Sequence, residues 1–162
     1  MSYPEARYHK ETGEISATCR SAGEPPDLAI GASTSVRYLA TGQSTDGRFG
    51  LYRWDMKPQA SGPKPHFHKT MAESFFILSG TVRLYNGAVW IDAKAGDYLY
   101  VPEGGIHAFQ NESRDPASML ILFAPGAPRE GYFQALADLA AGRRFTEEEW
   151  TDLCRRHDNY FV

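Results

Sequence analysis

Short apolar runs separated by turn-forming residues dominate the chain between about residues 34 and 124. The runs are rich in β-branched and aromatic residues, which is typical of short β-strands. Eight strands are predicted: Ser35–Thr41, Phe49–Met56, Ser74–Leu78, Thr81–Tyr85, Val89–Asp92, Asp97–Val101, His107–Asn111 and Ser118–Phe123. Asn86-Gly87 predicts a two-residue hairpin between two of them. So many short strands with closely spaced turns favour a sandwich or a barrel.

The apolar pattern takes on a helical period after about residue 127. A first helix is predicted between Pro128, which can occupy a first helical position, and Gly142, which lies just past the end. A second helix opens with the capping-box sequence Thr146-Glu147-Glu148-Glu149. It continues with residues at helical spacing: Trp150, Leu153, Cys154 and His157. We expect both helices to pack on the outside of the β domain.

Residues 1–33 are polar and carry little periodicity, and Glu24-Pro25-Pro26-Asp27 predicts a turn or linker. The pattern therefore divides the chain into three parts. These are an N-terminal arm over residues 1–33, a β domain over residues 34–126 and a pair of helices of the same domain over residues 127–162.

Composition narrows the classes of function. A chain of 162 residues has the size of one domain, and its net charge of −3 disfavours a nucleic-acid partner. No apolar run approaches the roughly 20 residues that span a bilayer, and the N-terminal sequence is too polar for a signal peptide. Two cysteines, Cys19 and Cys154, are too few for a disulfide framework. We therefore expect a cytoplasmic protein with free thiols and no membrane partner.

Three of the five histidines form a pattern that suits a metal ion. His66 and His68 are two residues apart, so on an extended segment both imidazoles face the same side. Glu73 follows after a short turn, and His107 comes from a distant strand. Three imidazoles and one carboxylate suit one divalent transition metal per chain, of Fe, Mn, Ni, Zn or Cu, rather than Mg or Ca.

The spacing of these residues resembles the two motifs of the cupin superfamily. The first motif reads His66-Phe67-His68, four residues, Glu73, six residues, Gly80. The second reads Gly96, five residues, Pro102-Glu103-Gly104, two residues, His107, three residues, Asn111. One position departs from the family pattern, because Ala60 stands where a glycine usually opens the first motif, and Gly62 follows two residues later.

The resemblance implies an all-β cupin jelly-roll β-barrel, with the two C-terminal α-helices outside and one metal in the barrel mouth. It also implies a homodimer, in which the N-terminal arm could cross to the partner subunit. The sequence is most similar to single-domain proteins of the quercetin-dioxygenase-like type. That similarity implies a metal-dependent dioxygenase, an oxidoreductase acting on a small aromatic, flavonol-like or polyketide-like phenol or enol. His66, His68, Glu73 and His107 would be the metal ligands, and Glu73 would also be the general base.

Two alternatives remain open at this stage. Related small cupins catalyse cyclisation or isomerisation at the same site, and a cupin can also bind a ligand without turnover. Phe75 shares strand parity with Glu73, and Phe109 shares it with His107, so both should face the barrel interior. Each is either a wall of the substrate pocket or simple core packing.

Overall fold

The computed structural model describes residues 2–162 and consists mainly of antiparallel β-sheet. The larger sheet has six strands in the order β1-β2-β3-β10-β5-β8, and the smaller has three in the order β7-β6-β9. The six strands are β1 (Leu28–Ile30), β2 (Thr34–Ala40), β3 (Gly50–Met56), β10 (Ala117–Ala124), β5 (Ala72–Ser79) and β8 (Tyr98–Val101). The three are β7 (Trp90–Lys94), β6 (Thr81–Tyr85) and β9 (Ala108–Gln110).

Alternation of buried and half-buried residues in the central strands places the core between the sheets. In β3 every second side chain is buried, and Tyr52, Trp54 and Met56 point inward. These residues pair with the central strand β10, in which Met119 and Ile121 are also buried. The structure confirms the all-β fold class, and the alternation along β3 decides which face of the sheet the core covers.

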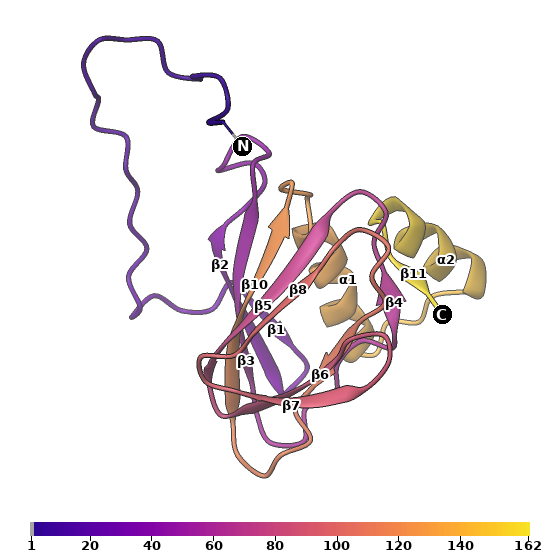
Figure 1. The fold of residues 1–162 in the computed structure, drawn as a ribbon. Coiled ribbons are helices and arrows are strands. Elements are labelled where there is room, and N and C mark those ends of the chain that lie inside the picture. The colour runs from indigo at the N-terminus through magenta and orange to yellow at the C-terminus, as the bar shows by residue number, and fades with distance from the viewer. Residues whose placement is uncertain (1) are drawn as a thin grey trace.

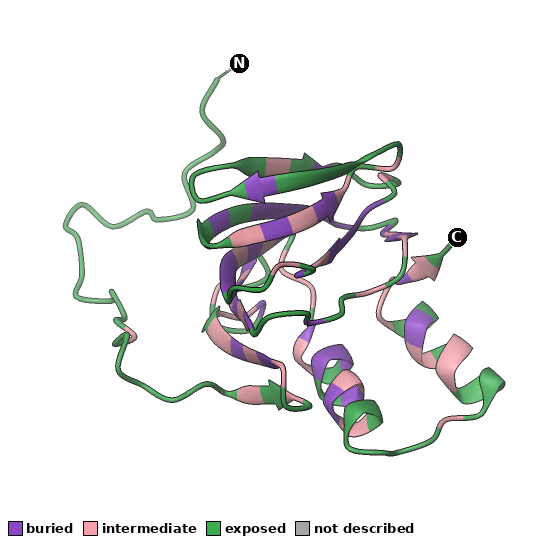
Figure 2. Cartoon of the chain, turned by 90° about the horizontal axis from the view of Figure 1, so that it is seen from below, coloured by how far each residue is buried: buried purple, intermediate pink, exposed green. Residues whose placement is uncertain are grey.

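Two helices cover one side of the barrel, α1 (Glu130–Ala140) and α2 (Glu147–Arg156) (Figure 1). The Phe133 ring of α1 packs edge-on against the rings of Tyr52 and Trp54, with both centroid distances at 5.1 Å. At the start of α2, the Thr146 hydroxyl accepts from the Glu149 amide and the Glu149 carboxylate accepts from the Thr146 amide. This is the predicted capping box, and both helices lie outside the β domain as expected (Figure 2).

Two local predictions were wrong. Tyr85 pairs with Trp90, so the loop between β6 and β7 has four residues rather than two. The Asn86 side-chain oxygen accepts from the amides of Ala88 and Val89, and this local turn competes with the shorter hairpin. In α1 the N-cap is Arg129, so Pro128 precedes the helix instead of occupying its first position.

Three short strands were not predicted from the sequence. β1 lies inside the segment expected to form the arm and pairs with β2. The other two, β4 (His66–Phe67) and β11 (Tyr160–Phe161), pair with each other, although more than 90 residues separate them in the sequence. Strands of two or three residues are too short to show a period. Across residues 2–162, the structure contains no helix of the length and apolar character that a bilayer crossing requires.

Candidate metal centre

The four predicted metal ligands come from three separate places in the fold. His66 lies on β4 and His68 directly follows that strand, while Glu73 lies on β5. His107 immediately precedes β9 and forms a bridge with His66, in which each amide donates to the other residue's carbonyl, at 3.0 and 2.9 Å. This bridge brings the distant second motif against the first.

The ligand atoms of these four residues all lie within 4.8 Å of one another. Each side chain is at most 5% exposed, so the cluster is enclosed by protein. Glu73 Oε2 lies 2.9 Å from His68 Nε2 and 2.8 Å from His107 Nε2. The structure therefore assembles the mixed nitrogen and oxygen donor set expected from the sequence, in a place where a transition metal would be shielded from water.

Backbone carbonyls orient all three imidazoles in the same way. The Nδ1 atoms of His66 and His107 lie 2.9 Å from the carbonyls of Lys64 and Gly105, and His68 Nδ1 lies 2.6 Å from the Asp158 carbonyl. A carbonyl can only accept, so each Nδ1 carries the proton. This tautomer leaves the Nε2 lone pairs for a metal, and such outer contacts are typical of metal-binding histidines.

The charges of the buried residues also favour a cation at the centre of the cluster. Burial raises the pKa of Glu73, but the adjacent His107 and His68 outweigh it and hold the pKa well below its usual range. For His107, burial lowers the pKa, but the Glu73 charge and hydrogen bond raise it overall. Burial, followed by the charge of His107, lowers the pKa of His66 to about 3. The Glu73 carboxylate thus faces the Nε2 atoms of His68 and His107 where a metal ion would bind, and the residues fit a divalent transition metal.

Asp158, which the sequence analysis did not identify, lies in the C-terminal segment and supports the candidate metal-binding residues (the metal cluster: His66, His68, Glu73 and His107). Its carbonyl orients His68, and its carboxylate accepts from the Thr70 amide at 2.8 Å, the Thr70 hydroxyl at 2.8 Å and the Lys69 amide at 3.0 Å. Asp158 has a φ of 55°, a left-handed conformation that aspartate tolerates better than most residues. The loop between His68 and Glu73 is therefore fixed by a residue from the other end of the chain.

The departure from the cupin pattern near residue 60 is absorbed locally. Gly62 lies against the backbone of Phe109, where a β-carbon would come 1.6 Å from the Phe109 carbonyl oxygen. Ala60 is buried and its carbonyl accepts from the Asn111 amide at 2.9 Å. Gly62 thus supplies the close approach between the segment before the first motif and the strand that carries the second.

A cavity of about 630 Å³ opens beside the metal cluster and is lined by His66 and Glu73. Its walls are largely apolar and come from the barrel interior, α1, α2 and β11; the larger side chains are Trp54, Phe109, Ile121, Phe123, Tyr132, Phe133, Leu136, Leu139, Trp150 and Phe161. Phe109 therefore faces the cavity. Phe75 does not line it and packs in the core, with its ring 5.9 Å from the His107 ring.

Arg129 lines the same cavity and was also missed by sequence reasoning. It is only 3% exposed, and no periodic signal marks an N-cap arginine as buried. Burial lowers the pKa of Arg129, while the charge of Glu73 acts in the opposite direction. A guanidinium remains protonated in proteins, so the cavity holds a fixed positive charge.

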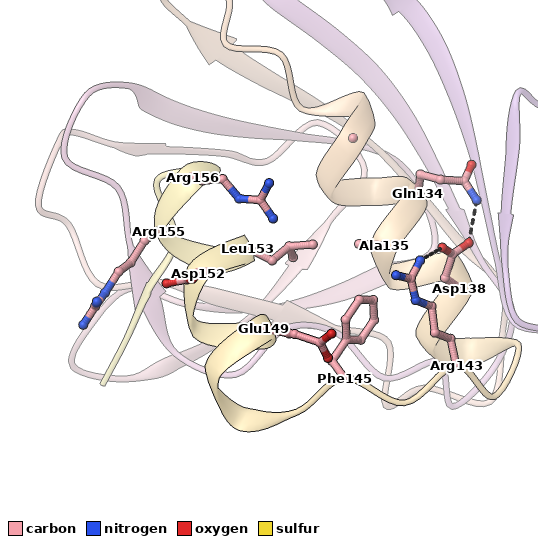
Figure 3. Close-up of a pocket in the computed structure, with 11 residues that line it drawn as sticks. Gln134, Ala135, Asp138, Arg143, Phe145, Glu149, Asp152, Leu153, Arg155 and Arg156 are labelled. Carbon is pink, nitrogen blue, oxygen red and sulfur yellow. Dashed lines mark hydrogen bonds and ion pairs between the residues drawn. The ribbon is translucent and has the colours of Figure 1, made fainter.

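A second hollow, of about 810 Å³, lies between α1 and α2 (Figure 3). Its walls are largely charged and polar, and Asp138 accepts from both Arg143 and Gln134. None of the metal cluster lines it. The cavity beside the histidines is therefore the better candidate for a functional site.

Comparison with known proteins agrees with this geometry. The family model described as the cupin domain matches residues 52–123. Quercetin 2,3-dioxygenase from Bacillus subtilis is 28% identical over 114 residues, which cover 67% of this chain and 32% of that protein. A second curated relative, from Aquifex aeolicus, is matched over 50% of its length. The chain thus spans between a third and a half of the curated relatives that it matches.

Solved structures share the fold at low sequence identity. A predicted oxalate decarboxylase from Thermotoga maritima has a TM-score of 0.59 at 18% identity, with 67% of this chain and 99% of that chain covered. The polyketide cyclase RemF from Streptomyces resistomycificus has a TM-score of 0.57 at 17% identity, with 68% and 80% covered. The fold, the two motifs and the family model over residues 52–123 agree, and each makes the chain similar to cupin proteins.

Proposed function

We propose that this protein is a metal-dependent cupin enzyme, a dioxygenase that acts on a small aromatic, flavonol-like or polyketide-like phenol or enol. The observation that carries the proposal is the cavity. His66 and Glu73 lie in the wall of a space of about 630 Å³ that is otherwise lined mainly by aromatic and aliphatic side chains. Apolar walls with a few convergent polar groups are the usual form of a small-molecule site.

The residues of the chain divide the work of such a site between them. His66, His68, Glu73 and His107 would hold the metal, which supplies Lewis acidity and one-electron chemistry when bound. The aromatic walls would exclude water and align a flat ring beside the cluster. The Glu73 carboxylate lies in the cavity wall, where it can take the proton from a phenol or enol hydroxyl.

The relationship to Bacillus subtilis quercetin 2,3-dioxygenase supports the oxygenase assignment, although the match covers 32% of that protein. Cyclisation or isomerisation of an enol would use the same base and the same cavity without consuming oxygen. Binding without turnover is the remaining alternative. Oxygen uptake distinguishes these three possibilities, whereas metal content alone does not.

The test is oxygen consumption by the metal-loaded protein with quercetin and a panel of hydroxynaphthalenes, with product analysis in parallel. We expect oxygen uptake that depends on both metal and substrate. If product forms without oxygen uptake, the dioxygenase assignment is wrong and the protein is a cyclase or isomerase. If no product forms, the protein only binds its ligand.

A variant of Glu73 tests the proposed base. Glu73→Gln keeps the size and one oxygen donor, so it should retain a substantial fraction of the metal but lose turnover by about a hundred- to ten-thousand-fold. Glu103→Gln is the matched control, because Glu103 is exposed and lies outside the cluster. Wild-type activity in metal-loaded Glu73→Gln would remove the general-base role.

A further inference from the structure

Arg129 is a buried cation without a carboxylate partner. One terminal nitrogen donates to the His157 carbonyl and the other donates to the Asn159 side-chain oxygen at 3.1 Å. Its Nε atom is buried and has no hydrogen-bond partner within residues 2–162. Neither acceptor carries a charge, so the structure leaves the positive charge of this side chain without a direct counter-ion. A buried charge in that state is costly.

Aromatic rings surround the guanidinium and offset part of this cost. The guanidinium carbon lies 4.9 Å from the ring centroid of Phe123, 4.8 Å from that of Tyr132 and 5.7 Å from that of Phe133. Cation–π contacts hold the group in place but do not neutralise it. The negative charge that acts on it most strongly is that of Glu73.

Arg129 and the metal cluster share one cavity. Arg129, Glu73, His66 and Phe123 all line it. The Phe123 ring contacts both groups, with its centroid 6.1 Å from that of the His68 ring and 4.9 Å from the guanidinium carbon of Arg129. A ligand in this cavity can therefore contact both the histidine cluster and the guanidinium.

The charge of the loaded cavity determines what it would bind. A divalent metal contributes two positive charges, Glu73 one negative and Arg129 one positive, so the loaded site is positive by two units. Lys64 lines the same cavity as an exposed residue and adds a further cation. With walls that are otherwise mainly apolar, this cavity favours a ligand that is flat, aromatic and anionic.

We propose that the substrate is an aromatic acid: a flat phenol or enol that carries a carboxylate at the end opposite its reactive oxygen, with the carboxylate bound by Arg129. The position of the reactive oxygen rests on the function proposed above, whereas the carboxylate site rests on Arg129 alone. A planar guanidinium with an unused N–H is suited to a carboxylate, and charge-assisted hydrogen bonds are the stronger kind.

A pair of matched ligands tests the proposal by calorimetry. The probes are 6-hydroxy-2-naphthoate and the neutral 6-hydroxy-2-naphthamide, which share a shape and differ in charge. The zinc-loaded wild type should bind the naphthoate at least about tenfold more tightly than the amide, since a hydrogen bond to a charged group contributes that much. The chelator-treated protein should keep part of this preference, because Arg129 does not depend on the metal. Equal affinities for the two probes in the wild type would overturn the proposal.

Variants then assign the preference to Arg129. Arg129→Gln should remove it, Arg129→Lys should keep it in reduced form, and Lys64→Gln at the cavity mouth should change it much less. Arg129 also contacts the C-terminal segment, so zinc content and the melting curve are measured for every variant. If Arg129→Gln does not fold, Arg129→Lys and the wild-type ligand pair still decide the question. An undiminished preference in either folded Arg129 variant would contradict the assignment.

The binding assay needs no turnover. If the protein prefers the naphthoate through Arg129 but consumes no oxygen, the proposed reaction is wrong and the carboxylate site still stands. A protein that turns over neutral phenols and shows no preference for the naphthoate would keep the reaction and lose this inference.

Discussion

The two ends of the chain are built in opposite ways. Residues 2–19 are all exposed and loop away from the barrel, and their one ion pair to the body joins Arg7 to Asp46 at the surface, at 3.3 Å (Figures 1 and 2). The C-terminal segment, residues 144–162, instead contacts the metal cluster. Its strand β11 pairs with β4, and Asp158 orients His68.

The difference shows that the two motifs that supply the histidine cluster do not orient it by themselves. Both motifs end by residue 111, yet one of the three imidazoles is oriented by a carbonyl 90 residues downstream of it. Arg129 links the cavity to the C-terminal segment, because it lines the cavity and donates to His157 and Asn159. The C-terminal segment is therefore a structural part of the candidate metal centre, whereas residues 2–19 are exposed and lie away from it.

Removing residues 144–162 should have the largest effect. The deletion exposes the face of α1 beneath α2, and it removes both the partner of β4 and the support of His68. We expect a loss of about 4 kcal/mol or more, which lowers the melting temperature by roughly 10 °C or causes aggregation, together with loss of bound metal. An unchanged melting curve with full metal content would show that the segment is only a tail.

Acid offers a way to empty the metal site without changing the C-terminal segment. Glu73 raises the pKa of His107, so a proton competes for its Nε2 at a higher pH than for a free histidine, at about 6.5. His66, with a pKa of about 3, does not compete. Metal affinity should therefore fall about tenfold per pH unit as His107 takes up its proton. Metal titrations at pH 8, 7, 6 and 5 check this, and a flat affinity would argue against histidine ligation.

Asp158→Ala should produce a smaller effect at a single point. It removes the acceptor for the Lys69 and Thr70 amides and strains a left-handed residue, so the His68 loop loosens. The backbone carbonyl that accepts from His68 remains in this variant, so the effect comes only from the loosened loop, and metal affinity should fall by no more than about tenfold. The matched control is Asp152→Ala, at an exposed position of α2. Equal metal affinity in the two variants would mean that the Asp158 carboxylate is not needed to hold the loop that carries His68.

Removing residues 2–18 should have the smallest effect. Exposed residues with few contacts contribute within about 0.5 kcal/mol, so the melting temperature should change by no more than about 2 °C and metal content should stay the same. The expected role of the arm between two subunits is tested on the same variant by sedimentation. A loss of dimer on deletion would show that the arm crosses to a partner, and an unchanged oligomeric state would exclude it.

The sequence predicted the parts of the site that depend on local geometry. His66 and His68 face the same side because neighbouring positions on an extended chain alternate, and Glu73 returns after one short turn. The eight predicted strands were found because each lies in a run of β-branched and aromatic residues between turn-forming residues. The placement of His107 relied on the cupin resemblance, since spacing alone does not bring residue 107 beside residue 66.

Contacts made across the fold could not be predicted. Asp158 acts on His68 through a backbone carbonyl, which every residue has, so no sequence signal marks it. Arg129 looks like a helix-start residue, and only the packing of α1 against the barrel buries it. The pairing of β4 with β11 has no sequence signal either, because each strand has two residues and the pairing joins distant segments. These are the features that tie the C-terminal segment to the site.

Elemental analysis tests the central claim most directly. We predict one transition-metal ion per chain in the wild type reconstituted at pH 8, and loss of most of that metal in His66→Ala and in His107→Ala, with His9→Ala as the exposed control. Full metal content in either cluster variant would remove that residue from the ligand set. A wild type that takes up no metal would contradict the account of the His66, His68, Glu73 and His107 cluster as a metal centre.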